Sequence, residues 1–161
     1  MSRPFRILFL CTGNSARSQI AQALLTQLGR GRFESASAGT APAERVNPGA
    51  LEALAKAGVP WEGQAPRRVD GLVRTDWDLV VTVCDDARES CPVFPSGPIM
   101  VHWGMPDPAA VEDASARRQA FAETLRALRS RITDLVALPV EELPRAELER
   151  RIGEIARLYS A

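Results

Sequence analysis

Short apolar runs alternate with longer amphipathic stretches along this chain, an order typical of α/β proteins with a parallel sheet. We expect four strands, at about residues 6–10, 33–38, 78–83 and 99–102. The third run is apolar almost throughout, which favours a central strand covered on both faces. The pattern therefore predicts an α/β fold with a single four-stranded parallel sheet and helices on both of its faces.

Helical spacing of apolar residues and the signals at helix ends place the helices between these strands. We expect helices from Ser18 to Gly29, from Asn47 to Gly58 and over about 115–136, with a short helix at 69–73. Gly29 suits a C-cap, and the pair Asn47-Pro48 suits an N-cap followed by proline at the first helical position.

The C-terminal segment adds one more expected helix. Pro139 interrupts the chain after the long helix, and Pro144 suits the first position of a new one. Apolar residues then recur at helical spacing, at Leu148, Ile152, Ile155 and Tyr159. This stripe either packs on the core or forms a surface for a partner or a second copy. We divide the chain into a main domain, 1–137, and a helical extension of the same domain, 138–161.

Length and charge narrow the function classes. The 161 residues suit one domain, and 20 basic and 20 acidic residues give a formal net charge of zero. This balance gives no global sign of nucleic-acid binding. No apolar run approaches the roughly 20 residues of a membrane span, and the N-terminus lacks the apolar segment of a signal peptide. We expect a cytoplasmic protein that binds neither nucleic acid nor membrane.

The most specific chemical signal lies between the first strand and the first helix, in the sequence Cys-Thr-Gly-Asn-Ser-Ala-Arg-Ser at 11–18. Gly13 and Asn14 tolerate the positive φ that a tight loop demands. Successive backbone N–H groups and the helix N-terminus would form a cradle for an oxyanion. The expected oxyanion-binding residues are Thr12, Gly13, Asn14, Ser15, Ala16, Arg17 and Ser18.

Cys11 opens this loop and Arg17 closes it, so a thiol and a guanidinium would face the same anion. A free thiol, with a pKa near ~8.5, is mostly protonated at neutral pH. We expect the helix N-terminus and Arg17 to lower the pKa of Cys11, and Ser15 or Ser18 to donate a hydrogen bond to the sulfur or the anion. Such a site suits nucleophilic attack on a tetrahedral oxyanion such as phosphate or arsenate. The alternative is a buried structural cysteine beside a surface arginine.

Three further residues follow later strands, whose carboxyl ends meet at one edge of a parallel sheet. Cys84 follows the run at 78–83, and Cys91 lies seven residues on, across a polar stretch. Asp107 stands between two prolines after the last strand. From the residues alone, Asp107 is either a general acid or a turn residue, and Cys84 is either a redox thiol or a core residue.

Other residues carry weaker signals. No group of cysteine and histidine has zinc-site spacing, so we expect no metal and no bound cofactor. The single histidine, His102, is most simply a packing residue at a strand end, and the three tryptophans, Trp61, Trp77 and Trp103, are expected to pack as well.

With these motifs the chain resembles the low-molecular-weight tyrosine phosphatase family and, within it, the thioredoxin-coupled arsenate reductases. The resemblance covers about residues 5–136. It rests on Cys-Thr-Gly-Asn-Ser-x-Arg-Ser-Gln at 11–19, Ser-Ala-Gly at 37–39, Val-Asn-Pro at 46–48, Asp-Leu-Val-Val-Thr-Val-Cys at 78–84, Cys-Pro at 91–92, His-Trp-Gly at 102–104 and Asp-Pro at 107–108.

The resemblance implies a three-cysteine relay with Arg17 as part of the catalytic loop. Cys11 would attack arsenate while Asp107 assists loss of hydroxide. Cys84 would then attack the Cys11 sulfur and release arsenite. Cys91 would finally take over the disulfide, which thioredoxin would reduce. Phosphate or sulfate would compete with arsenate as oxyanions.

The chain departs from the family pattern at two places. Position 16 is alanine where many relatives have a second cysteine, so no disulfide can form within the loop. Some relatives hold a monovalent cation beside the loop with acidic side chains, where this chain has Gln22 and, nearby, Arg67, with Asn14 and Ser37 left as possible ligands. An arginine would repel a cation, so we expect turnover that does not depend on potassium.

Two other functions compete with arsenate reduction. The runner-up is a phosphatase acting on phosphotyrosine or small phosphoesters, since the loop and Asp107 serve both reactions. Phosphotyrosine-specific relatives usually have aromatic residues after the acid, whereas Ala109 and Ala110 follow here, so we expect only weak phosphatase side activity. A cysteine phosphocarrier needs neither Arg17 nor a redox pair and fits least well.

Overall fold

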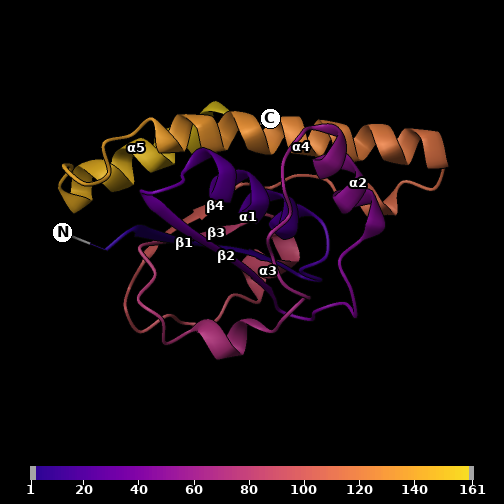
Figure 1. Ribbon diagram of the computed structural model, residues 1–161. Coiled ribbons are helices and arrows are strands. Elements are labelled where there is room, and N and C mark those ends of the chain that lie inside the picture. Colours follow the sequence, from indigo (N-terminus) through magenta and orange to yellow (C-terminus); the bar gives the residue numbers. More distant parts are fainter. Residues whose placement is uncertain (1–2, 160–161) are drawn as a thin grey trace.

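The sheet has the predicted four parallel strands in the computed structural model, which describes residues 3–159. Within this part of the chain the order is β2-β1-β3-β4, and each neighbouring pair is parallel (Figure 1). The strands are β1 (Phe5–Cys11), β2 (Phe33–Gly39), β3 (Leu79–Thr82) and β4 (Ile99–His102). Their carboxyl ends therefore lie at one edge, as the doubly wound topology requires.

Helices cover both faces of this sheet. Figure 1 shows α1 (Arg17–Leu28), α2 (Pro48–Lys56) and α4 (Ala114–Val136) on one side, with α3 (Asp85–Glu89) and the 3₁₀ turn η1 (Val69–Leu72) on the other. A second 3₁₀ turn, η2 (Pro108–Ala110), precedes α4. The predicted architecture is confirmed, although α3 was not predicted.

The predicted caps at Asn47 and Gly29 are present at the ends of their helices. The Asn47 side chain accepts a hydrogen bond from the N–H of Gly49 at 2.8 Å, and Pro48 is the first helical residue. The N–H of Gly29 bonds the carbonyl of Leu25 and closes α1. The second helix ends at Lys56, two residues before the predicted boundary at Gly58, which has a positive φ of 71°.

The core lies between the sheet and its helices. Strand β1 is buried from Ile7 to Leu10, and β3 is buried along its whole length, as expected for central strands. Trp77 and Trp103 are buried as predicted. Trp61 is 37% exposed, so its predicted packing role is wrong. Its indole N–H instead donates to the Gln19 side chain at 3.1 Å, a polar contact that an exposed ring can make.

The apolar stripe of α5 (Arg145–Leu158) packs on the rest of the chain. Leu148, Ile152 and Ile155 are buried, and the helix contacts β4 and α4. The hydroxyl of Tyr159, just after the helix, donates to the Asp134 carboxylate at 2.5 Å. Of the two uses considered for this stripe, packing on the core is the one the structure contains.

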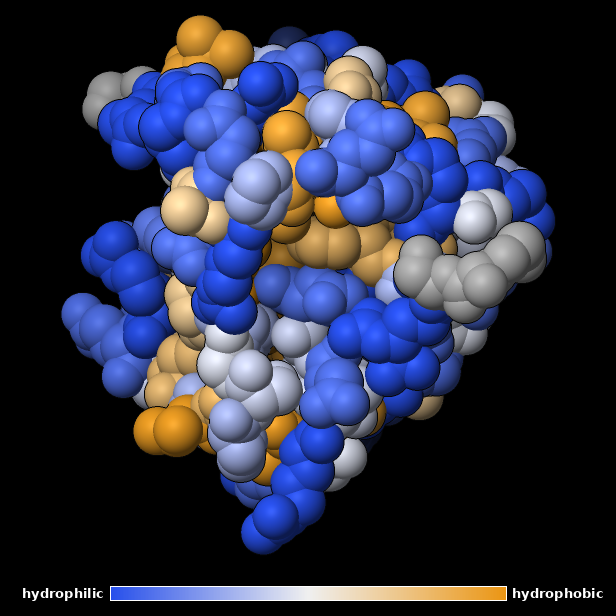
Figure 2. Space-filling model, turned by 90° about the vertical axis from the view of Figure 1, so that its left-hand side faces the viewer, coloured by the Kyte–Doolittle hydropathy of each residue, from blue (hydrophilic) through white to orange (hydrophobic). Residues whose placement is uncertain are grey.

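The surface near α5 is mostly hydrophilic. Figure 2 shows this side of the molecule, with apolar side chains gathered mainly in a recess at its centre. Among the described residues, no helix is both long and apolar enough to cross a membrane.

Candidate active site

The loop from Cys11 to Arg17 joins β1 to α1 and is held by Asn14. Among residues 3–159, Asn14 is the only non-glycine residue with a positive φ, 50°, whereas Gly13 does not adopt the left-handed conformation expected for it. The Asn14 amide donates to the hydroxyls of Ser18 at 2.8 Å and Ser37 at 2.9 Å. Its carbonyl oxygen accepts the N–H of Arg67 at 3.1 Å. The fully buried Asn14 side chain therefore ties the loop to α1 and β2.

Gly39 at the end of β2 lets the chain approach this loop closely. A Cβ at Gly39 would lie 2.4 Å from the carbonyl oxygen of Thr12, a distance that backbone atoms cannot tolerate. The N–H groups of Thr40 and Ala41 donate to the carbonyls of Cys11 and Thr12 at 3.1 and 2.9 Å. These bonds hold the loop through its carbonyl groups and not through its N–H groups, as an anion cradle requires.

The sulfur of Cys11 lies inside the loop and is only 3% exposed. It lies 2.8 Å from the Ser18 hydroxyl and accepts the N–H of Asn14 at 3.2 Å. Burial raises the pKa of Cys11 above its usual value, while these two bonds and the charge of Arg17 lower it. The predicted net lowering of this pKa is therefore wrong, because enclosure of the sulfur outweighs its donors. Ser18, not Ser15, bonds the sulfur.

Arg17 connects the loop to the segment that carries Asp107. Its Nη1 donates to the carbonyl oxygen of Met105 at 3.0 Å. Asp107 is exposed, and its Oδ1 accepts the N–H of Ala109 at 3.0 Å, so the side chain also caps the turn η2. The two roles considered for Asp107 are compatible, since one oxygen holds the turn while the carboxyl group faces the cleft.

A cleft of about 780 Å³ at this edge of the sheet brings together four of the predicted residues, Thr12, Arg17, Cys84 and Asp107. Its lining residues are Thr12, Arg17, Cys84, Asp85, Asp86, His102, Gly104, Met105, Pro106 and Asp107. Cys11 is buried and does not line the cleft, but its chain neighbour Thr12 does.

Cys84 adjoins the loop from the neighbouring strand. The N–H of Val83 bonds the carbonyl of Leu10 at 3.0 Å, which places the ends of β3 and β1 side by side. The Cys84 sulfur lies 3.3 Å from the Thr12 hydroxyl and accepts the N–H of Ala87 at 3.4 Å, so this residue caps α3. The structure therefore places a second sulfur beside the oxyanion loop.

Cys91 lies beyond the other end of α3 and does not line the cleft. Its thiol is half-buried and donates weakly to the carbonyl of Pro92, at 3.6 Å. Burial raises the pKa of Cys91. All three cysteines are free thiols in this structure.

His102 takes part in a polar network that the sequence analysis missed. Its Nε2 lies 2.8 Å from Oδ1 of Asp85, and its Nδ1 lies 2.8 Å from the hydroxyl of Thr82. Thr82 and His102 are register partners in β3 and β4. Only this pairing reveals the contact, because the two residues lie 20 positions apart in the chain.

The residues near the expected cation position bind one another. The Nε of Arg67 donates to the carbonyl of Ser37 at 3.0 Å, and the Ser37 hydroxyl donates to Oε1 of Gln22 at 2.5 Å. In the part of the chain that the structure describes, no group of three or more His, Cys, Asp or Glu residues could hold a metal ion.

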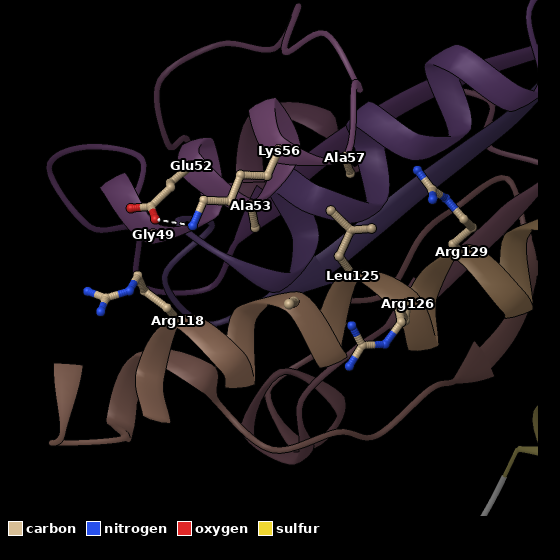
Figure 3. A pocket seen from close by; sticks show the side chains of 10 residues that line it. Gly49, Glu52, Ala53, Lys56, Ala57, Arg118, Leu125, Arg126 and Arg129 are labelled. Atoms are coloured by element: carbon tan, nitrogen blue, oxygen red, sulfur yellow. Dashed lines mark ion pairs between the residues drawn. The ribbon is translucent and has the colours of Figure 1, made fainter. Parts of the chain in front are cut away.

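A second cavity, of about 240 Å³, lies between α2 and α4 (Figure 3). Ala53 of α2 and Leu125 of α4 line it from its two sides, and Arg118 and Arg126 line it as well. No cysteine lines it, and neither Arg17 nor Asp107 reaches it. The 780 Å³ cleft, in contrast, is lined by Arg17, Cys84 and Asp107 and by Thr12, the neighbour of Cys11, so this cleft is the candidate active site.

Comparison with known proteins gives consistent matches over most of the chain. The family described as low molecular weight phosphotyrosine protein phosphatase matches residues 6–150. An arsenate reductase of Bacillus subtilis is 37% identical over 120 residues, which are 74% of this chain and 86% of that protein.

Solved structures agree with the sequence matches. The arsenate reductase of Archaeoglobus fulgidus superposes with a TM-score of 0.66 at 33% identity, covering 82% of this chain and 99% of that one. The thioredoxin-dependent arsenate reductase of Corynebacterium glutamicum gives a TM-score of 0.58 at 29% identity, covering 81% of this chain and 62% of that one.

Proposed function

Because the chain belongs to the low molecular weight phosphotyrosine protein phosphatase family, we propose that it reduces arsenate to arsenite through Cys11, Cys84 and Cys91, used in that order. The observation that carries this proposal is the position of Cys84. Its sulfur lies 3.3 Å from the hydroxyl of Thr12, the residue next to the nucleophile, in the same cleft as Arg17 and Asp107. Hydrolysis of a phosphoester requires no second thiol there.

In the first step, the Cys11 thiolate attacks the arsenic of dihydrogen arsenate. A sulfur–arsenic bond forms, and one oxygen leaves as water after taking a proton from Asp107. The N–H groups of residues 12–18 and the guanidinium of Arg17 bind the remaining oxygens and stabilise the developing charge. The bond from Arg17 to the Met105 carbonyl keeps the guanidinium and the acid segment on the same side of the cleft.

In the second step, the Cys84 thiolate attacks the Cys11 sulfur. A Cys11–Cys84 disulfide forms, and the electron pair of the sulfur–arsenic bond passes to arsenic, which leaves as arsenite. The two thiols thus supply the two electrons of the reduction. The short distance from the Cys84 sulfur to the Thr12 hydroxyl supports Cys84 as the second nucleophile.

In the third step, the Cys91 thiolate attacks Cys84, the Cys84–Cys91 bond forms, and Cys11 leaves as a thiolate. Cys91 is the most accessible of the three thiols, so the final disulfide is the one that an external dithiol reaches. Thioredoxin is the proposed reductant, supported by the thioredoxin-dependent relative from Corynebacterium glutamicum.

The alternative is a phosphatase acting on phosphotyrosine or small phosphoesters. The loop and Asp107 support it equally, so weak hydrolysis of small aryl phosphates is part of the proposal. The residues after the acid argue against a phosphotyrosine cleft, because Ala109 and Ala110 offer no aromatic wall.

The test is NADPH oxidation in the presence of thioredoxin, thioredoxin reductase and arsenate, for the wild type and for Cys91→Ser. The proposal predicts continuous turnover by the wild type and a single cycle by the variant. Equal turnover of both proteins would show that Cys91 is not the resolving thiol. Aryl phosphate hydrolysis without NADPH consumption would identify a phosphatase.

A further inference from the structure

We propose that His102 and Asp85 are positioning residues that hold α3 in place and thereby set how fast Cys91 reaches Cys84. This inference rests on the proposed relay, in which these two cysteines exchange a disulfide across α3. It concerns two side chains in the cleft whose function neither the oxyanion loop nor the acid explains.

The hydrogen-bond geometry fixes the imidazole in one orientation. An ionised carboxylate only accepts, so Nε2 of His102 donates to Oδ1 of Asp85 at 2.8 Å. In the neutral ring, Nδ1 then accepts from the hydroxyl of Thr82, also at 2.8 Å. The side chain of His102 is only 19% exposed, whereas that of Asp85 is 74% exposed. The largely buried imidazole of His102, on the sheet, therefore bonds the exposed carboxylate of Asp85, on α3.

Gly104 leaves the room that this orientation needs. A Cβ at position 104 would lie 2.8 Å from Nε2 of His102 and 3.5 Å from Oδ1 of Asp85. Any side chain there would displace the imidazole from the hydrogen bond. The hydrogen bond between His102 and Asp85 therefore depends on glycine at position 104 as well as on the two side chains.

The helix that receives this bond has little to stabilise it. It spans five residues, far fewer than an isolated helix needs to be stable in water. Its own residue Ala87 is buried, and Cys84 caps its start. The ion pair between Arg88 and Asp85 lies within the helix, at 3.9 Å, and is exposed. The bond from Asp85 to His102 ties the first helical residue to the last residue of β4.

The relay requires this helix to move. Cys84 and Cys91 flank α3, and a disulfide needs their Cα atoms within about 4.4–6.8 Å of each other. The ordered helix, five residues or about 1.4 turns long, stands between them. In the exchange, the Cys84–Cys91 bond forms as the Cys11–Cys84 bond breaks and Cys11 departs as a thiolate. Opening of the Asp85–His102 bond is then part of the conformational cost of that step.

The test uses the Cys84–Cys91 pair alone, in a Cys11→Ser background. The reduced protein is treated with diamide, which accepts the two electrons and two protons released as the disulfide forms, and the loss of free thiols is followed. Asp85→Ala and His102→Phe should each form the disulfide about two- to tenfold faster, the effect expected from one net hydrogen bond. Asp85→Asn, whose amide oxygen still accepts the imidazole N–H, should stay close to the parent rate.

Asp86→Ala is the matched control. Asp86 is also an exposed acid in the first turn of α3, so its removal alters the helix dipole interaction and the charge near Cys84 in the same way, without touching His102. Hydrogen exchange gives a second readout, because the amides of Arg88 and Ser90 bond within α3. They should exchange faster in Asp85→Ala, while amides of β3 stay unchanged.

Equal acceleration by Asp85→Ala and Asp86→Ala would overturn the proposal, since helix charge would then explain the rate. Unchanged rates in both Asp85→Ala and His102→Phe would overturn it as well. The assay contains neither arsenate nor thioredoxin, so its outcome is independent of whether the protein reduces arsenate.

Discussion

The hydroxyl of Ser18 lies 2.8 Å from the Cys11 sulfur at a buried position, so Ser18→Ala removes a donor from the thiolate with little room for water to replace it. A hydrogen bond to a charged group contributes about 1.5–3 kcal/mol, equivalent to a roughly 10- to 150-fold lower thiolate fraction at a pH below the pKa. The remaining thiolate is more nucleophilic, with a Brønsted coefficient of about 0.4–0.5. The net reactivity of Cys11 should therefore fall about 3- to 20-fold at neutral pH.

Alkylation by iodoacetamide measures this effect without reference to any substrate. The rate at Cys11 is followed by mass spectrometry over a range of pH, in a background with Cys84→Ser and Cys91→Ser. Because burial raises the pKa of Cys11, the thiolate fraction and the rate should rise with pH through the alkaline range. In Ser18→Ala the same rise should occur at higher pH.

Ser15→Ala is the control, since Ser15 belongs to the same loop while Ser18 makes the bond to the sulfur. Its pH profile should match that of the parent protein. The reasoning is refuted if Ser18→Ala and Ser15→Ala give the same profile, because the hydroxyl at 2.8 Å would then not stabilise the thiolate.

Three further predictions test the acid, the cation position and the C-terminal helix. Asp107→Asn should slow single-turnover arsenite formation about 100-fold or more, through loss of the proton donor, and an unchanged rate would exclude general acid catalysis by this residue. Replacing choline chloride by potassium chloride at constant ionic strength should leave the turnover rate unchanged, because the charged Arg67 bonds the Ser37 carbonyl near the position where some relatives hold a cation. Activation by potassium would contradict this prediction. Ile152→Ala should lower the free energy of unfolding in urea by about 2–5 kcal/mol, whereas Leu158→Ala, at a 70% exposed position of the same helix, should change it little. Equal losses in the last two variants would show that α5 does not depend on its buried stripe.

The sequence was sufficient for the sheet and the loop because their signals are local. Apolar runs of strand length identified β1 and β3, and a cysteine and an arginine closing a glycine-asparagine loop identified the oxyanion cradle. The N-cap at Asn47 followed from two adjacent residues. Each of these features depends on neighbours within a few positions.

The features that were missed depend on burial or on contacts between distant segments. Helix α3 has five mostly polar residues, too few to show a helical period. The raised pKa of Cys11 reflects how completely the fold encloses the sulfur. The network of His102 depends on the register of β3 and β4, and the bond from Arg17 to Met105 joins segments 88 residues apart. Neither can be inferred from spacing along one chain.

Arsenite released by the reduced protein, in the absence of any reductant, tests the central proposal most directly. One equivalent of arsenite per protein molecule should form after arsenate is added, and peptide mapping should then find a disulfide between Cys84 and Cys91, with Cys11 free. Protein that releases no arsenite and retains three free thiols would contradict the relay and leave the phosphatase interpretation in its place.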